Sequence, residues 1–179
     1  MDSAKISISP YKSPFGELIL GSFEEKLCLC DWKFRKMRET VNQRIKKGLN
    51  ADFVEEETET ITETKNQLGE YFNGSRKEFQ IPILFVGTDF QKQVWEELMK
   101  IPYGKTQSYL GLSRQLKNEK AIRAVASANG ANALSIIVPC HRIIGTSGEL
   151  IGYAGGLNTK KALLDLENPH KELQMELFG

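Results

Sequence analysis

Cysteine chemistry is the most specific chemical feature of this sequence. The segment Val138-Pro139-Cys140-His141-Arg142 sets a thiol beside an imidazole, at the end of an apolar run and just before a glycine-rich loop. A thiol attacks as its thiolate, and a nearby base or cation supplies that form at neutral pH. Among the three cysteines of the 179-residue chain, only Cys140 is followed directly by a base and a cation. Cys140 is therefore the leading candidate for a nucleophile.

The other two cysteines have a simpler interpretation. Cys28 and Cys30 are spaced by two in an apolar segment, which places them on one face of a predicted strand. A metal site would need further ligands, and the only histidines, His141 and His170, are distant in sequence. We expect buried or half-buried structural thiols and no metal site. An odd number of cysteines also argues against a disulfide framework and favours a reducing, cytoplasmic location.

Composition indicates an ordinary globular protein. The chain is 40% hydrophobic and 26% charged, and its formal net charge of +1 gives no overall signal for nucleic acid. Charge is distributed unevenly: residues 89–166 hold ten Lys/Arg against six Asp/Glu, whereas residues 1–88 hold thirteen against fourteen. This asymmetry permits a phosphate-facing surface in the second half. No secretory signal or membrane-spanning apolar stretch is visible.

The first half, residues 1–87, predicts an α/β arrangement. Alternating apolar residues and Pro/Gly punctuation indicate strands and hairpins up to Trp32. The charged stretch 33–50 predicts a loop or a short exposed helix. A helix is expected to open within 55–64 and to end at Phe72. The segment 79–85, interrupted by Pro82, is expected to form an edge strand.

The second half, residues 88–170, changes in character. Thr88 or Asp89 can cap a helix whose apolar residues recur at spacings of three and four. Short helices over 109–116 and 120–129 suggest a helix-turn-helix unit, which by itself is a weak indicator of DNA binding. The second of these helices is rich in alanine and serine. Such small side chains permit close approach of either a packed neighbour or a DNA groove.

The segment 135–138 predicts a short strand that leads into Pro139, and residues 160–167 predict a final helix. Neighbouring residues on an extended chain point to opposite faces. We therefore expect His141 to act on the Cys140 thiol through a bridging water. The five glycines between Gly145 and Gly156 predict a sharply bent loop whose backbone a ligand can approach.

From Thr88 to Glu167 the chain resembles the O6-alkylguanine–DNA alkyltransferase family (methylated-DNA–protein-cysteine methyltransferases). The matching segments, in family order and spacing, are Phe90-Gln91-Lys92-Gln93-Val94-Trp95, Ile101-Pro102-Tyr103-Gly104, Ser108-Tyr109, Ala121-Ile122-Arg123-Ala124-Val125, Asn129-Gly130-Ala131-Asn132, Pro139-Cys140-His141-Arg142 and Gly152-Tyr153-Ala154-Gly155-Gly156. The first half resembles the family more loosely, through Ser13-Pro14-Phe15-Gly16 and Tyr71-Phe72-Asn73-Gly74. Ala126 and Ala133 depart from the glycine and proline common in the family, and neither change removes a reactive group.

The resemblance implies an α+β protein. It would consist of an N-terminal ribonuclease-H-like α/β domain (1–87), a C-terminal winged-helix-like DNA-binding alkyltransferase domain (88–170) and a tail (171–179). The implied activity is irreversible transfer of the alkyl group from O6-methylguanine, and also O4-methylthymine, in double-stranded DNA to Cys140. The protein would be a monomer and would need no cofactor, and the zinc ligands of some relatives have no counterpart in its first half.

The resemblance also implies roles for individual residues. The catalytic set would be Cys140, His141, Glu167, Tyr109 and Asn132: Glu167 orients His141, Tyr109 gives a proton to the purine, and Asn132 holds the turn. The DNA-binding residues would be Arg123, Ala124, Ser127 and Ala128, with Arg123 filling the gap left by a flipped nucleotide. The substrate pocket would be formed by Tyr153, Ala154 and Gly155.

Two alternatives remain open on the sequence. Cys140, His141 and Glu167 could form the triad of a cysteine hydrolase, or the chain could sense DNA lesions without chemistry. Separately, the C-terminal segment Gln174-Met175-Glu176-Leu177-Phe178 resembles the short peptide by which bacterial repair proteins bind the sliding clamp. Gln174 would be its polar anchor, and Leu177 and Phe178 would fill an apolar pocket. A tail that packs on its own domain is the other interpretation.

Overall fold

The first half of the chain is built on a four-stranded sheet. A computed structural model describes residues 4–169. Its sheet contains β1 (Ala4–Ser13), β2 (Gly16–Phe23), β3 (Lys26–Trp32) and β4 (Ala51–Glu55) in the order β3-β2-β1-β4. The first three strands form an antiparallel meander, and β4 lies parallel to β1. This is the expected ribonuclease-H-like arrangement.

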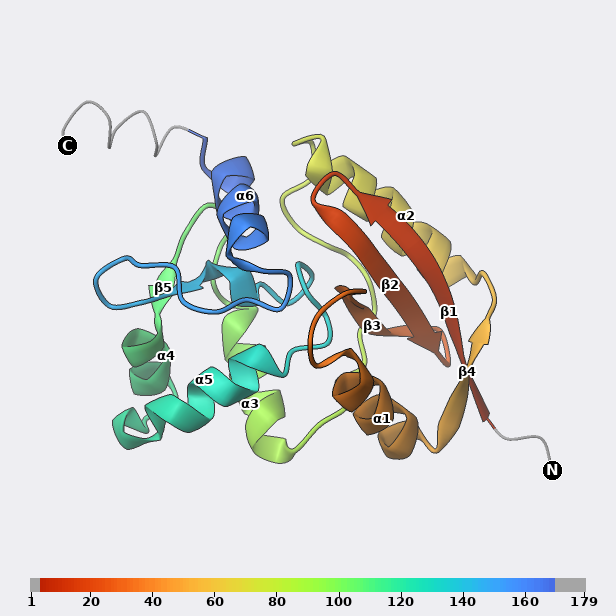
Figure 1. Ribbon diagram of the computed structural model, residues 1–179, viewed down its shortest axis with the longest axis horizontal. Helices are drawn as coiled ribbons and strands as arrows, with labels where there is room; N and C mark the ends of the chain where they lie inside the picture. Colours follow the sequence, from red (N-terminus) through yellow and green to blue (C-terminus); the bar gives the residue numbers. More distant parts are fainter. Residues whose placement is uncertain (1–3, 170–179) are drawn as a thin grey trace.

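Two helices cover opposite faces of this sheet (Figure 1). The helix α1 (Arg38–Leu49) buries Val41 and Ile45 against one face. The helix α2 (Glu59–Phe72), capped by the Thr58 hydroxyl, buries Ile61 and Leu68 against the other. Because both faces are covered, the sheet has a core on each side, and one of these cores continues into the second half of the chain.

The second half is mainly helical. It contains α3 (Asp89–Leu98), the short strand β5 (Gln107–Ser108), α4 (Tyr109–Gln115), a 3-10 turn (Glu119–Ala121) and α5 (Ile122–Gly130), followed by a second 3-10 turn (Cys140–Arg142), β6 (Ile143–Ile144) and α6 (Leu157–Glu167). A capping box joins Thr88 and Gln91 at the start of α3. The helices α3, α4 and α5 pack together, and β5 pairs with β6. Within residues 4–169 no helix is long and apolar enough to cross a membrane.

The two halves meet along the outer edge of β3. The Cys30 amide donates to the Ala133 carbonyl at 2.8 Å, and the Ser135 amide donates to the Cys30 carbonyl at 2.7 Å. Further along the same edge, Leu27 exchanges backbone hydrogen bonds with Pro82 and Leu84. The exposed edge that β3 would otherwise present is thus paired with backbone from the second half and from the connecting segment.

The predicted strand over 135–138 is wrong. Ile136 has a φ of 73°, and Ser135 forms a bridge with Val138, so the chain turns back on itself there. Cys140 and His141 then lie in a 3-10 turn rather than on extended chain. The alternation argument used to separate their side chains therefore does not apply, although a bridging water stays a prediction.

Three further expectations need correction. Cys28 and Cys30 are buried as predicted, but they join different core clusters, because a β-bulge at Cys28 adds one residue to β3. The stretch 33–50 contains α1, which is amphipathic and not simply exposed, since alternate turns carry apolar residues among the charges. The segment 79–85 pairs with β3 at a single bridge and forms no regular strand.

A buried carboxylate reinforces the junction. Asp31, at the end of β3, is fully buried and accepts hydrogen bonds from Arg35 and Arg38, each at 3.0 Å. Its other oxygen accepts from the Ser135 hydroxyl at 3.2 Å. Arg35 reaches onward to the carbonyls of Gly130 and Asn132, at 2.7 and 3.3 Å.

Replacing Asp31 by Asn should therefore destabilise the protein strongly. The amide keeps the shape but leaves two arginines without a counter-charge, which costs about 3 kcal/mol in a buried setting. Urea unfolding followed by circular dichroism would measure the loss. The matched control is Asp165→Asn, at a surface ion pair with Lys161, where less than about 1 kcal/mol is expected. Equal effects at both positions would contradict the role given to Asp31.

Candidate active site

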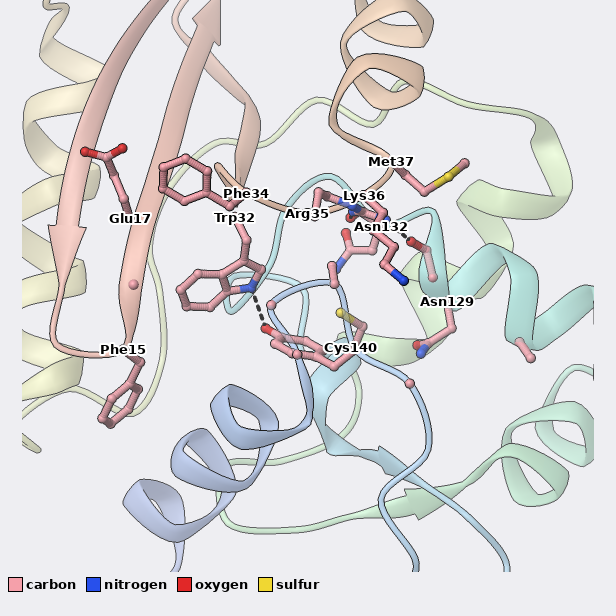
Figure 2. Close-up of a pocket in the computed structure, with 18 of the residues that line it drawn as sticks. Phe15, Glu17, Trp32, Phe34, Arg35, Lys36, Met37, Asn129, Asn132 and Cys140 are labelled. Atoms are coloured by element: carbon pink, nitrogen blue, oxygen red, sulfur yellow. Dashed lines mark hydrogen bonds between the residues drawn. The ribbon is translucent and has the colours of Figure 1, made fainter.

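A cavity of about 680 Å³ lies between the two halves, with Cys140 among its lining residues (Figure 2). Trp32, Phe34 and Arg35 line it from the first half, and Tyr109, Asn132 and the loop 152–156 line it from the second. This volume is within the range of pockets that bind small organic molecules. The end of α5, through Ala126, Asn129 and Gly130, also lines the cavity.

The Cys140 thiol is held in a dry setting. The residue is only 4% exposed, and burial raises the pKa of the thiol to about 11. A hydrogen bond from the Asn132 side chain and the positive charges of Lys160 and Arg35 act in the opposite direction and lower that pKa. Because burial is the larger effect, the resting sulfur carries its proton. Attack by this thiol requires a base that removes the proton as the reaction proceeds.

His141 and Glu167 form a buried pair. The His141 Nε2 lies 2.7 Å from the Glu167 Oε2, and neither side chain is more than 1% exposed. The carboxylate also accepts from Arg142, whose Nε donates to Oε1 at 2.8 Å and whose Nη2 donates to Oε2 at 3.0 Å. Glu167 is thus in direct contact with His141, and its orienting role in the reaction stays a prediction.

The charges of this pair follow from its surroundings. Hydrogen bonds from His141 and Arg142 outweigh the opposing effect of burial and hold the pKa of Glu167 far below its usual range, so the carboxylate stays ionised. Burial lowers the pKa of His141, which is therefore neutral at physiological pH. With Nε2–H donating to Glu167, the free lone pair is on Nδ1, a buried atom without a hydrogen-bond partner among residues 4–169. That nitrogen can accept a proton.

Asn132 organises the turn that carries the thiol. Its side-chain amide donates to the Val138 carbonyl at 2.9 Å, and its side-chain oxygen accepts from the Leu134 amide at 2.9 Å. Both bonds lie inside the segment that turns back before Pro139. These bonds place Asn132 where a residue that holds the turn would lie, and its part in the reaction stays a prediction.

The predicted pocket residues line the same cavity as Cys140, and their contact with a substrate stays a prediction. Tyr153, Ala154 and Gly155 are half-buried and line the cavity, and Tyr109 lines it from the first turn of α4. The Tyr109 hydroxyl donates to the Ile151 carbonyl at 3.2 Å. This hydroxyl therefore already binds the loop that borders the cavity.

The predicted DNA-binding residues fall into two groups. Arg123, Ala124 and Ser127 are exposed on α5, next to the cavity. Ala128 is only 3% exposed and packs in the core, where its carbonyl accepts from the Trp95 indole at 2.8 Å. The prediction of a DNA contact at Ala128 is therefore wrong, because the small side chain serves helix packing at that position.

Several residues of the site were missed on the sequence. The Trp32 indole donates to the Tyr153 hydroxyl at 3.0 Å, and a Cβ at Gly155 would lie 2.8 Å from that indole. Lys160 is fully buried, and its ammonium donates to the Ile151 and Gly152 carbonyls at 3.1 and 3.2 Å. Nothing in the local pattern distinguishes Lys160 from an exposed helix lysine.

Fold and site together define a class: a two-part protein in which a buried Cys–His–Glu set lies where a ribonuclease-H-like half meets a helical half. Family models agree with this division. The ribonuclease-like domain of 6-O-methylguanine DNA methyltransferase matches residues 6–85, and its DNA-binding domain matches residues 89–169.

Individual relatives support the same assignment. The chain is 48% identical over 169 residues to the methylated-DNA–protein-cysteine methyltransferase of Mycobacterium leprae, covering 93% of this chain and 94% of the relative. It is 36% identical to the crystal structure of the Mycobacterium tuberculosis O6-methylguanine methyltransferase, with a TM-score of 0.76 and coverage of 97% and 99%. A crystal structure of the M. tuberculosis protein in complex with DNA matches with a TM-score of 0.77 at 36% identity, over 93% and 94% of the two chains. The chain belongs to the 6-O-methylguanine DNA methyltransferase family.

The buried Lys160 should give folding a distinctive pH dependence. Burial lowers its pKa from 10.5 to about 8. Between those values the unfolded chain binds more protons at this residue than the folded chain, so its contribution to the free energy of unfolding rises with pH. Relative to Lys160→Met, the wild type should gain about 2 kcal/mol between pH 7 and pH 10, measured by urea unfolding.

The matched control is Lys161→Met, one position along on the exposed face of α6. The difference between that variant and the wild type should stay constant across the same pH range. If the difference in the free energy of unfolding between Lys160→Met and the wild type also stayed constant with pH, a lowered pKa of Lys160 in the folded protein would be contradicted.

Proposed function

We propose that the protein repairs DNA directly, by moving the alkyl group of O6-methylguanine in double-stranded DNA to the sulfur of Cys140. The observation that carries the proposal is a buried thiol in a cavity of about 680 Å³, which is large enough to admit a purine base and lies beside the exposed face of α5. Relatives named methylated-DNA–protein-cysteine methyltransferase support the reaction class. The proposed division of the chain is 1–87, 88–170 and 171–179.

The first step generates the nucleophile. His141 accepts the thiol proton at Nδ1 through a water, and the ionised Glu167 stabilises the imidazolium that results. Burial disfavours a standing thiolate, so the proton leaves as the sulfur engages the alkyl carbon. The positive charge of Lys160 favours the thiolate as it develops.

The second step is displacement at the alkyl carbon. The sulfur–carbon bond forms as the carbon–O6 bond breaks, and the electron pair of that bond passes to the purine. Tyr109 gives a proton to the purine at N3, and backbone amides near Tyr153 and Ala154 hold O6. In the free protein the Tyr109 hydroxyl donates to the Ile151 carbonyl, so the substrate base replaces the loop as its partner.

Access to the thiol requires rotating the nucleotide out of the stack. Arg123, exposed at the start of α5, fills the vacated position. Ala124 and Ser127 let the helix approach the minor groove closely. Few contacts to base edges are needed, because repair must not depend on sequence, and affinity should fall with salt.

Each molecule acts once. A thioether does not hydrolyse under mild conditions, and nothing in the proposed mechanism returns Cys140 to the free thiol. The proposed reaction therefore consumes the protein and needs no cofactor. We also expect transfer from O4-methylthymine, which presents its alkyl group on a smaller base to the same cavity.

Intact-mass measurement separates this proposal from its two alternatives. With excess duplex containing O6-methylguanine, the protein should gain one methyl group, about 14 Da, and Cys140→Ala should gain nothing. A cysteine hydrolase would instead turn over repeatedly on small esters without a lasting mass change. A lesion sensor would bind equally well with and without Cys140 and gain no mass. Either of these outcomes would falsify the transfer reaction.

The same assay tests base flipping. Arg123→Ala should slow transfer from duplex DNA about tenfold to a hundredfold, because the vacated stack is then empty. Transfer from the free O6-methylguanine base, which needs no flipping, should be unaffected. Arg114→Ala is the control, since this exposed arginine lies on α4 and pairs with Glu119. Equal slowing with both substrates would contradict the role of Arg123.

Partners beyond DNA stay proposals from sequence. The clamp-binding residues Gln174, Leu177 and Phe178 lie outside the described residues, and the monomeric state and cytoplasmic location are likewise proposed. Purified sliding clamp should capture the full chain in a pull-down, and deletion of 174–179 should abolish capture. Capture that survives the deletion, or no capture of the full chain, would reject the clamp hypothesis.

A further inference from the structure

The catalytic carboxylate receives a hydrogen bond from the opposite half of the protein. Tyr71, in the last turn of α2, is fully buried, and its hydroxyl donates to the Glu167 Oε2 at 2.6 Å. The two residues are 96 positions apart. No role in the reaction proposed above uses this contact.

We propose that Tyr71 is a positioning residue for alkyl transfer, and that it limits through Glu167 how strongly His141 holds a proton. This inference rests on the proposed function, in which His141 accepts the thiol proton. Tyr71 is not among the residues that line the cavity, so we expect it to act through the carboxylate.

Three donors compete for one oxygen of Glu167. The Glu167 Oε2 accepts from His141 at 2.7 Å, from Arg142 at 3.0 Å and from Tyr71 at 2.6 Å. Each donor draws electron density from this oxygen and weakens its attraction for the others. The Tyr71 bond is the shortest of the three. Without it, more of the negative charge would act on the imidazole ring.

Stronger attraction would leave His141 protonated too readily. An imidazolium beside a less shared carboxylate is more stable, which raises the pKa of His141. A protonated His141 cannot accept the thiol proton. The Tyr71 hydroxyl therefore adds to the effect of burial, and it lowers the pH below which His141 is protonated.

The other titratable groups around His141 and Glu167 cannot replace the hydrogen bond from Tyr71. Arg142 already donates to both oxygens, and Lys160 on α6 acts on His141 only at a distance, lowering its pKa. Tyr153 faces the His141 ring at 6.5 Å between centroids, and its hydroxyl interacts with Trp32. Tyr103 donates weakly to the Leu166 carbonyl, at 3.4 Å. Among residues 4–169, Tyr71 is the uncharged hydroxyl on the carboxylate.

The tyrosine ring is fixed for this purpose. It packs against Phe72, Phe79 and Tyr103, with centroid separations of 5.3, 5.5 and 6.2 Å. Burial and the nearby Glu167 raise the pKa of Tyr71 far above its usual range, so the hydroxyl remains a donor at every pH of interest. Aromatic packing therefore fixes the orientation of the hydroxyl toward Glu167, and its high pKa ensures that the hydroxyl is the hydrogen-bond donor.

The test uses the full chain with Tyr71→Phe, which keeps the ring and removes the donor. Single-turnover methyl transfer from O6-methylguanine duplex is measured from pH 5 to pH 9. The acidic limb of the profile should move upward by about half a pH unit, with little loss of rate on the plateau. The pKa of His141, measured by NMR titration in a His170→Gln background that leaves one histidine, should move the same way.

A matched control and a second variant keep the outcome decisive. Tyr103→Phe removes a neighbouring phenol that donates to the Leu166 carbonyl rather than to Glu167, and it should shift both quantities less than Tyr71→Phe does. Site-specific 3-fluorotyrosine at position 71 makes a stronger donor of nearly the same size, and it should move the limb downward. If Tyr71→Phe unfolds the protein, the fluorinated variant still decides the question.

The results separate this inference from the proposed function. Loss of rate at all pH values with an unmoved limb would reduce Tyr71 to a packing residue and overturn the inference, while transfer to Cys140 in the wild type would stand. A wild type that gains no methyl group would overturn both.

Discussion

The backbone pairing between β3 and the segment that precedes the thiol fixes the geometry of the whole site. Two hydrogen bonds join Cys30 to Ala133 and Ser135, and they make the second half an extension of the sheet of the first. Asn132 then turns the chain toward Cys140, and Arg35 satisfies carbonyls at the end of α5. The edge of β3 thus fixes the positions of α5, of the turn held by Asn132 and of the Cys140 thiol. Residues from both halves can therefore line one cavity.

Electrostatics in the site follow from its dryness. Burial opposes the ionised form of the Cys140 thiol and of His141, yet Glu167 is held ionised by the donors around it. Glu167 is thus permanently ionised, while the neighbouring base His141 is neutral. Reactivity then arises only when a proton moves, so a resting molecule does not carry an exposed thiolate open to oxidants.

Sequence patterns predicted the elements better than their environment. Apolar spacing and capping residues located α2, α3, α4 and α5 closely, because each helix carries its own periodic face. The turn at Ile136 and the bulge at Cys28 were missed, since both depend on pairing with β3 rather than on local composition. In the site, the family motif identified the residues around Cys140, whereas Lys160 and Trp32 owe their positions to tertiary burial. At Ala128 the family resemblance led to a wrong DNA contact, because a small side chain suits a helix–helix contact as well as a DNA groove.

The way in which Lys160 holds the loop has an evolutionary consequence. Its ammonium binds the main-chain oxygens of positions 151 and 152, which every amino acid supplies. Drift in the side chains of this loop would leave the tether in place. Related proteins could therefore diversify the rim of the cavity, and with it the range of lesions they accept, without rebuilding the scaffold beneath. Lys160 itself would have to be retained for the loop to keep its position.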